Sequence, residues 1–205
     1  KLLAIERERN RISEDLHDDL GAGLSSIAMM TGVMRELITD EDSKNTADEV
    51  STEANELVAR MREIIWSMNS KNDTVENMLT YINDYCHRYL AKNKIEIRMQ
   101  MPEYVPDINI TSEARENTFL VIKETLHNAV KHAQSGKFSF QATLDTHWLT
   151  IKLNDHGKGF DLNAINRFGN GMLNMEQRIH KISGKFLITS EPGQGTQTHI
   201  EIPIS

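Results

Sequence analysis

Apolar and polar residues alternate with the period of an α-helix along the N-terminal third of the chain. Apolar residues separated by steps of three, four or seven positions are typical of one helical stripe. The stripe consists of Ile5, Ile12, Leu16, Leu20, Leu24 and Ile27. It predicts a helix from near residue 2 to Leu37 or Ile38, and the polar stretch 39–45 is expected to form the turn that follows.

A second helix is expected after this turn, with an apolar seam in which steps of four and three alternate, as in coiled-coil packing. The seam consists of Val50, Ala54, Leu57, Met61, Ile64 and Met68. Two such helices have too little apolar cover to stand alone, so the pattern predicts a four-helix bundle of two hairpins, and therefore a homodimer. Met29, Met30 and Met34 are assigned to that core rather than to a cofactor site. The polar segment 69–74 interrupts the seam and is the expected hinge.

The rest of the chain mixes helical and strand periods. Helices are expected at 76–92 and 112–134, and a half-buried strand is expected from Ile95 to Met101, where apolar and polar residues alternate. Further strands are expected at 138–144, 148–153, 185–190 and 196–203. Helices on one side of a mixed sheet make an α+β two-layer sandwich. The predicted fold is thus an all-α helical hairpin at 1–72, dimeric as a four-helix bundle, followed by an α+β two-layer sandwich at 76–205.

Composition narrows the classes of function. A chain of 205 residues with 39% hydrophobic content can form two compact units, and a net charge of −7 disfavours direct nucleic-acid binding. The single cysteine, Cys86, excludes an intrachain disulfide, fits a reducing cytosol and is expected to be an ordinary helix residue. No apolar run is long enough to span a bilayer. Because the chain begins at Lys1 inside an expected helix, we interpret it as a cytoplasmic fragment. Its sensor is expected upstream, with or without an anchor in the inner membrane.

Four polar and glycine boxes follow one another in the second part of the chain. They are Glu124-Thr-Leu-His-Asn128-Ala-Val-Lys131-His132, Asn154-Asp155-His-Gly157-Lys-Gly159-Phe160, Gly169-Asn-Gly171 and Gly193-Gln-Gly195-Thr196. Any one box could serve only as a turn. Together they predict a nucleotide pocket, although no P-loop or Rossmann fingerprint is present.

Each box has a chemistry suited to such a pocket. An amide on a helix can ligate Mg²⁺, which prefers oxygen ligands beside substrate phosphates. A carboxylate on a glycine turn can accept a hydrogen bond from the adenine amine. A Gly-x-Gly before a helix can offer backbone N–H groups to phosphate.

The order of the boxes resembles the ATP-binding domain shared by gyrase-type ATPases, Hsp90 chaperones, MutL proteins and sensor histidine kinases. The resemblance covers about residues 76–205 and implies binding of ATP and Mg²⁺. It places the magnesium ligand at Asn128 and the adenine contact at Asp155. The glycine boxes of the family match Gly157, Gly159, Gly169, Gly171, Gly195 and the neighbouring Thr196.

The N-terminal helix selects among these relatives. The string from Glu6 to Gly21, Glu-Arg-Glu-Arg-Asn-Arg-Ile-Ser-Glu-Asp-Leu-His-Asp-Asp-Leu-Gly, resembles the phosphoacceptor helix of nitrate-sensor-type histidine kinases. His17 matches the phosphorylated histidine, and Asp18 matches the acidic residue that follows it. A neutral imidazole is nucleophilic, and a neighbouring carboxylate can fix its tautomer. The resemblance implies a two-component sensor kinase that passes phosphate to an aspartate on a separate response-regulator receiver domain.

Some roles stay open at this point. Lys131 and His132 could contact phosphates or could lie in a solvated helix end, and Glu124 could contact magnesium or a water molecule. The lid between the two glycine boxes, 161–168, is short, as in the nitrate-sensor type. Two rival functions are a gyrase- or chaperone-type ATPase, which releases free phosphate, and a degenerate ATP-binding scaffold without turnover.

One position departs from the family. Many nitrate-sensor-type kinases carry an amide, usually glutamine, five positions after the phosphorylated histidine, where it is thought to orient the water that dephosphorylates the regulator. This chain has Ala22 there. A methyl group can neither donate nor accept a hydrogen bond, so we expect weak phosphatase activity. The alternative is that Asp18 or the receiver itself positions the water.

Overall fold

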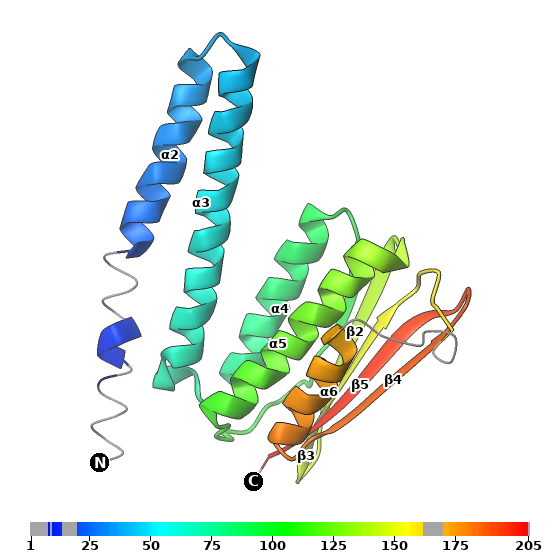
Figure 1. Ribbon diagram of the computed structural model, residues 1–205. Helices are drawn as coiled ribbons and strands as arrows, with labels where there is room; N and C mark the ends of the chain where they lie inside the picture. The colour runs from blue at the N-terminus through cyan, green and yellow to red at the C-terminus, as the bar shows by residue number, and fades with distance from the viewer. Residues whose placement is uncertain (1–7, 9, 14–19, 162–169, 205) are drawn as a thin grey trace. The chain divides into compact units, whose positions relative to one another are not determined.

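The structure is a computed structural model that describes residues 8, 10–13, 20–161 and 170–204. The chain forms two compact units, residues 1–72 and residues 73–205. Each unit is described by itself below (Figure 1).

The first unit is a hairpin of two helices, α2 (Ala22–Leu37) and α3 (Glu41–Met68) (Figure 1). Before α2, residues 8 and 10–13 are helical, and Leu20 and Gly21 form a π turn. The turn between the two helices is shorter than the predicted 39–45. The helix begins at Glu41 because the Asp40 side chain accepts a hydrogen bond from the Ser43 N–H at 2.9 Å, a typical N-cap.

The predicted seam of α3 is divided between two environments. Ala54 and Met61 are buried against the hairpin's own interior, whereas Val50, Leu57 and Ile64 are 39–50% exposed. The described residues of α2 include none that is buried. Its large apolar side chains are exposed in the single chain, namely Ile27, Met29, Met30, Val33, Met34 and Leu37. Both helices of the hairpin therefore contribute large apolar side chains to an apolar face that the single chain leaves exposed.

The second unit is a two-layer sandwich in which three helices cover one face of a five-stranded sheet (Figure 1). The helices are α4 (Val75–Lys92), α5 (Ser112–Asn128) and α6 (Asn170–Lys181). The strands are β1 (Glu96–Gln100), β2 (Lys137–Leu144), β3 (Trp148–Asp155), β4 (Lys185–Glu191) and β5 (Gly195–Pro203). The sheet order is β1-β2-β3-β5-β4, with β1 parallel to β2 and all other pairs antiparallel. The mixed sheet with helices on one side confirms the predicted fold class.

Strand alternation builds the core of this unit. Inward-facing side chains of the central strands are buried, while their neighbours in the sequence are more exposed. The buried strand residues include Phe138, Phe140, Ala142, Leu149, Ile151, Leu153, Ile200 and Ile202. They meet apolar stripes of the three helices, including Met78, Ile82, Ile122, Leu126 and Ile179. Cys86 is part of this core and has no exposed surface.

Among the described residues, no helix is both long and apolar enough to cross a membrane.

Candidate functional site

The helix that carries the first polar box changes its geometry within that box. The sequence predicts a helix to about residue 134, and the chain is helical to Ala133, although α5 ends at Asn128 and a π-helical turn, Ala129–Ala133, follows. The chain then leaves the helix through Gln134, whose φ of 54° is left-handed. A wider turn rotates Lys131 and His132 away from the α-helical direction that the sequence predicts, and both side chains are exposed. Such π turns often occur at functional sites.

Asp155 is the last residue of β3 and the centre of the second box. Its side chain is only 6% exposed. One carboxylate oxygen, Oδ1, accepts a hydrogen bond from the Gly157 N–H at 3.0 Å, which closes a tight turn around the side chain. Across the sheet, Asp155 pairs with Thr196 of β5, so the second and the last box are neighbours.

The second box also touches the end of the first. The Lys158 N–H donates to the Ala133 carbonyl at 2.8 Å. A Cβ placed on Gly157 would overlap the backbone and side chain of Ala133. Only glycine allows this approach, so Gly157 has a packing role whether or not a nucleotide is bound.

The last glycine box closes against the second. Gly195 has a φ of +78°, and a Cβ on it would overlap the Asp155 carbonyl. Ser190 of β4 braces the same region, because its hydroxyl donates to the Gly195 carbonyl at 2.8 Å and accepts from the Phe160 N–H at 3.0 Å. The same hydroxyl lies 3.2 Å from the Thr196 hydroxyl. Sequence reasoning missed Ser190, and its only signal was its place at a strand end before a glycine turn.

The third box adjoins the first through two antiparallel helices. Gly171, at the start of α6, lies beside the Glu124 carboxylate of α5, and a Cβ there would be 3.0 Å from Oε1. Further along the pair, the Arg178 guanidinium donates to the side-chain oxygen Oδ1 of Asn117 at 3.3 Å. Between the helices is a hollow of about 350 Å³. It is lined by Leu120, Lys123, Glu124, His127, Gly171, Asn174, Met175 and Arg178.

Most predicted site residues of the second unit therefore lie at one end of its sheet, where α5 ends and α6 begins (Figure 1). Glu124, Asn128, Asp155, Gly157, Gly159, Gly171, Gly195 and Thr196 belong to these adjoining boxes. His17, Asp18 and Gly169 lie outside the described residues.

The donor set at this end suits a magnesium ion bound beside phosphates. Asn128 and Glu124 are four positions apart on α5 and share one helix face. An amide oxygen and a carboxylate are hard ligands, and Mg²⁺ in proteins is usually held by one or two such groups together with substrate phosphates and water. Among the described residues, no group of three or more His, Cys, Asp or Glu side chains could hold a metal ion.

Comparison with known proteins gives the class of each unit. Residues 8–73 match the family model described as "Histidine kinase". Residues 114–205 match the model described as "Histidine kinase-, DNA gyrase B-, and HSP90-like ATPase". A nucleotide-binding domain of this class on the same chain as a histidine kinase helical domain defines a kinase core. The chain belongs to the two-component sensor histidine kinases, as its sequence predicts, and ATP is the nucleotide of its second unit.

The relatives agree with this family. The chain is 26% identical to the sensor histidine kinase LiaS of Bacillus subtilis over 206 residues, covering 100% of this chain and 56% of LiaS. It is 21% identical to the sensor protein VraS of Staphylococcus haemolyticus, covering 98% of this chain and 57% of VraS. The chain thus spans little more than half the length of these two relatives.

A solved structure shows the same fold. The histidine kinase domain of the blue-light-activated histidine kinase from Erythrobacter litoralis EL346 superposes with a TM-score of 0.59 at 14% identity. The match covers 89% of this chain and 94% of that domain.

Proposed function

We propose that the protein containing this chain is an ATP-dependent protein-histidine kinase that phosphorylates its own His17. The observation that carries the proposal is the meeting of the polar and glycine boxes around Asp155, on a chain whose first 73 residues include a histidine kinase match. Asp155 is buried and has a second carboxylate oxygen, which suits it to accept the adenine amine. Gly171 at the start of α6 suits phosphate binding at a helix N-terminus.

Phosphoryl transfer then needs positioning and charge neutralisation more than covalent chemistry. A lone pair on a neutral His17 nitrogen attacks the γ-phosphorus, the bond to the β–γ bridging oxygen breaks, and ADP leaves. Asp18 accepts the N–H of the other ring nitrogen and stabilises the imidazolium that forms. A magnesium ion held by Asn128, with Glu124 beside it, would neutralise charge on the β- and γ-phosphates. Lys131 and His132 supply further basic groups near the phosphates.

The partners follow from the family and from the hairpin. Sensor histidine kinases of this family dimerise and act on response regulators in general. We infer that here the dimer forms through the exposed apolar residues of α2 and α3, because a second hairpin would cover Leu57 and Ile64 together with the methionines of α2. The phosphoryl group on His17 then passes to an aspartate on a separate receiver domain.

One experiment tests the central step. The chain is incubated with γ-labelled ATP, and the label is followed through acid and alkali. A phosphoramidate loses phosphate in acid and survives alkali, whereas phosphoserine does the reverse, and Ser13, Ser25 and Ser26 are close to His17 in the sequence. We expect acid-labile label on the wild type and none on His17→Gln. Acid-stable label that persists in His17→Gln, or release of free phosphate alone, would overturn the proposal and favour another kinase chemistry or a gyrase-type ATPase.

A further inference from the structure

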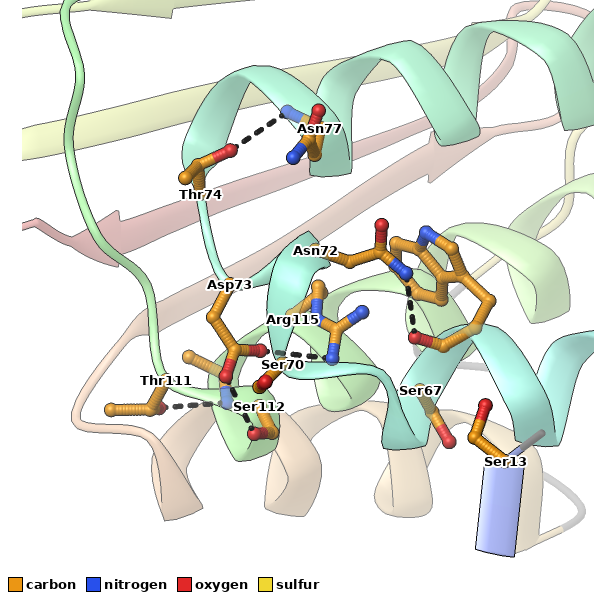
Figure 2. Close-up of polar contacts among 12 residues, drawn as sticks. Ser13, Ser67, Ser70, Asn72, Asp73, Thr74, Asn77, Thr111, Ser112 and Arg115 are labelled. Carbon is orange, nitrogen blue, oxygen red and sulfur yellow. Dashed lines mark hydrogen bonds and ion pairs between the residues drawn. The ribbon is translucent and has the colours of Figure 1, made fainter. Parts of the chain in front are cut away.

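Arg115 is a fully buried charge in the second unit. It lies in the first turn of α5, and its side chain has no exposed surface. Its Nη2 lies 2.9 Å from Oδ1 of Asp73, whose side chain is 29% exposed. The other oxygen of Asp73 accepts a hydrogen bond from the Ser112 hydroxyl at 3.3 Å. Figure 2 shows the Asp73 carboxylate between these two partners.

The backbone around Asp73 is bonded to the same part of the unit. The Ile110 N–H donates to the Asp73 carbonyl at 3.0 Å, and the Val75 N–H donates to the Ile108 carbonyl at 2.9 Å. Thr74 forms an isolated antiparallel bridge with Asn109 and caps α4 by accepting from the Asn77 N–H at 3.2 Å. The entry of the chain into the second unit is therefore held by side-chain and backbone bonds at once.

The residues just before Asp73 bond in the opposite direction, back to the end of α3. Ser70–Asn72 form a single 3₁₀ turn. The Asn72 side-chain amide donates to the Trp66 carbonyl at 3.2 Å, and its backbone N–H donates to the Asn69 carbonyl at 3.1 Å. Asn10 adds a bond within the first unit, from its side-chain amide to the Ser70 hydroxyl at 3.2 Å. Ser70 and Asn72 thus form hydrogen bonds with residues of the first unit, whereas Asp73 bonds to residues of the second.

We propose that the Asp73–Arg115 ion pair is an anchor that confines the pivot between the two units to residues 70–72, which makes Arg115 a positioning residue for phosphoryl transfer. This inference rests on the proposed function, since that function needs the ATP-bound unit to deliver phosphate to His17. A short 3₁₀ turn has poor hydrogen-bond geometry and yields readily. Breaking a buried ion pair by withdrawing one partner is strongly destabilising, and the Arg115 side chain is fully buried, so the Asp73 end resists opening.

The anchor is also coupled to the nucleotide site. Arg115 and Asn128 lie on one continuous helix, α5, thirteen positions apart. Because the bond to Asp73 fixes Arg115 near the start of α5, it also fixes how Asn128, at the other end of α5, is placed relative to the pivot. Loss of the anchor should move that end without changing its own contacts, and small misplacements of reacting groups reduce rates strongly.

Arg115→Met tests the anchor in the full chain, because methionine fills a similar volume and the remaining Asp73 carboxylate can reach water. We expect kcat for autophosphorylation to fall about tenfold while the KM for ATP stays within about twofold. Glu113→Gln is the matched control: it breaks the exposed Glu113–Lys181 ion pair on the same helix, and it should leave both constants unchanged. Unchanged kcat in Arg115→Met, or a fall in ATP affinity parallel to the fall in kcat, would overturn the anchor.

Hydrogen exchange on the wild-type chain tests the pivot independently of activity. The amides of Val75 and Ile110 should exchange at least about tenfold more slowly than the amide of Asn72. Equal protection of these amides would place the pivot elsewhere. If His17 takes no label from ATP, the proposed function fails, whereas the exchange pattern still decides whether Asp73 is held as inferred.

Discussion

Gly195 of the last glycine box lies so close to the carbonyl of Asp155 that no side chain could be placed between them. The two residues come from adjacent strands, β5 and β3, and Gly195 adopts a φ of +78°. The backbone of Gly195 therefore packs directly against the backbone of Asp155, the candidate adenine contact.

Gly195→Ala should destabilise the second unit by about 3 kcal/mol, because it combines a left-handed alanine with a steric overlap. It should also weaken ATP binding by displacing Asp155. Gly193→Ala is the matched control, since Gly193 has a similar φ of +81° but open space around its Cβ position. That control should cost about 1 kcal/mol. Thermal unfolding of both variants checks the difference, and equal losses would contradict the packing role of Gly195.

Asp155→Asn should weaken ATP binding about ten- to a hundredfold, because a charged hydrogen bond to the adenine amine is worth roughly 1.5–3 kcal/mol. The Gly157 N–H can still donate to the asparagine oxygen, so the turn itself should survive. His17→Gln should bind ATP as the wild type does. Titration calorimetry measures all three proteins, and wild-type affinity in Asp155→Asn would mean that adenine is bound elsewhere.

Leu57→Asp should convert a dimer into a monomer. The side chain is 39% exposed in the single chain and belongs to the apolar face of the hairpin. Burial of a leucine is worth about 1.5–3 kcal/mol, and the change removes it in both subunits. Leu187→Asp, on the exposed strand face of the other unit, is the control and should stay dimeric. Analytical ultracentrifugation decides, and a dimeric Leu57→Asp would mean that the subunits meet through another surface.

Ala22→Gln should raise the rate at which this kinase removes phosphate from its response regulator, with little effect on autophosphorylation. Ala22 is the first residue of α2 and its side chain is exposed, so glutamine fits without repacking. The test compares regulator-phosphate decay with wild type, with Ala22→Gln and with no kinase. Strong acceleration by the wild type, unchanged by glutamine, would show that the missing amide does not limit the reaction.

Cys86 should be unreactive in the folded chain. Burial raises the pKa of its thiol from 9.0 to about 12, so the thiolate, which is the reactive form, is suppressed at neutral and mildly alkaline pH. Unfolding returns the pKa to its ordinary value and exposes the sulfur. An alkylating reagent at pH 8 should therefore modify Cys86 only in denaturant. Rapid modification of the native protein would mean that α4 opens readily.

The fold could be predicted from the sequence because most of its elements have clear periodicity. The strand ending at Asp155 and the helix carrying Asn128 are both placed by alternation of apolar residues and by the polar boxes. The sequence predicts a helix at 112–134, and the chain is helical from Ser112 to Ala133, but the change to π geometry after Asn128 was not predicted. Apolar periodicity does not distinguish these two helix types at the end of a helix.

Arg115 illustrates the second limit. A charged residue within a helix predicts a solvated position, yet this side chain is fully buried because Asp73, 42 positions earlier, supplies its counter-charge. Ser190 was missed for a related reason, since its bond to the Phe160 N–H comes from a segment 30 positions away and its other two contacts depend on the pairing of β4 with β5. The family and its ATP-binding unit were predicted correctly, whereas the individual roles of His17, Asn128 and Asp155 stay predictions.

The divided seam of α3 makes the thermal stability of the helical unit depend on protein concentration. Ala54 and Met61 are buried within one hairpin, but Val50, Leu57 and Ile64 are exposed unless a second copy covers them. If that copy supplies the missing cover, the melting temperature of the helical unit rises with protein concentration, as it does for any fold completed by association. The sandwich, which buries its own core, melts at a temperature independent of concentration. Dilution would then unfold the helical unit while the sandwich remained folded.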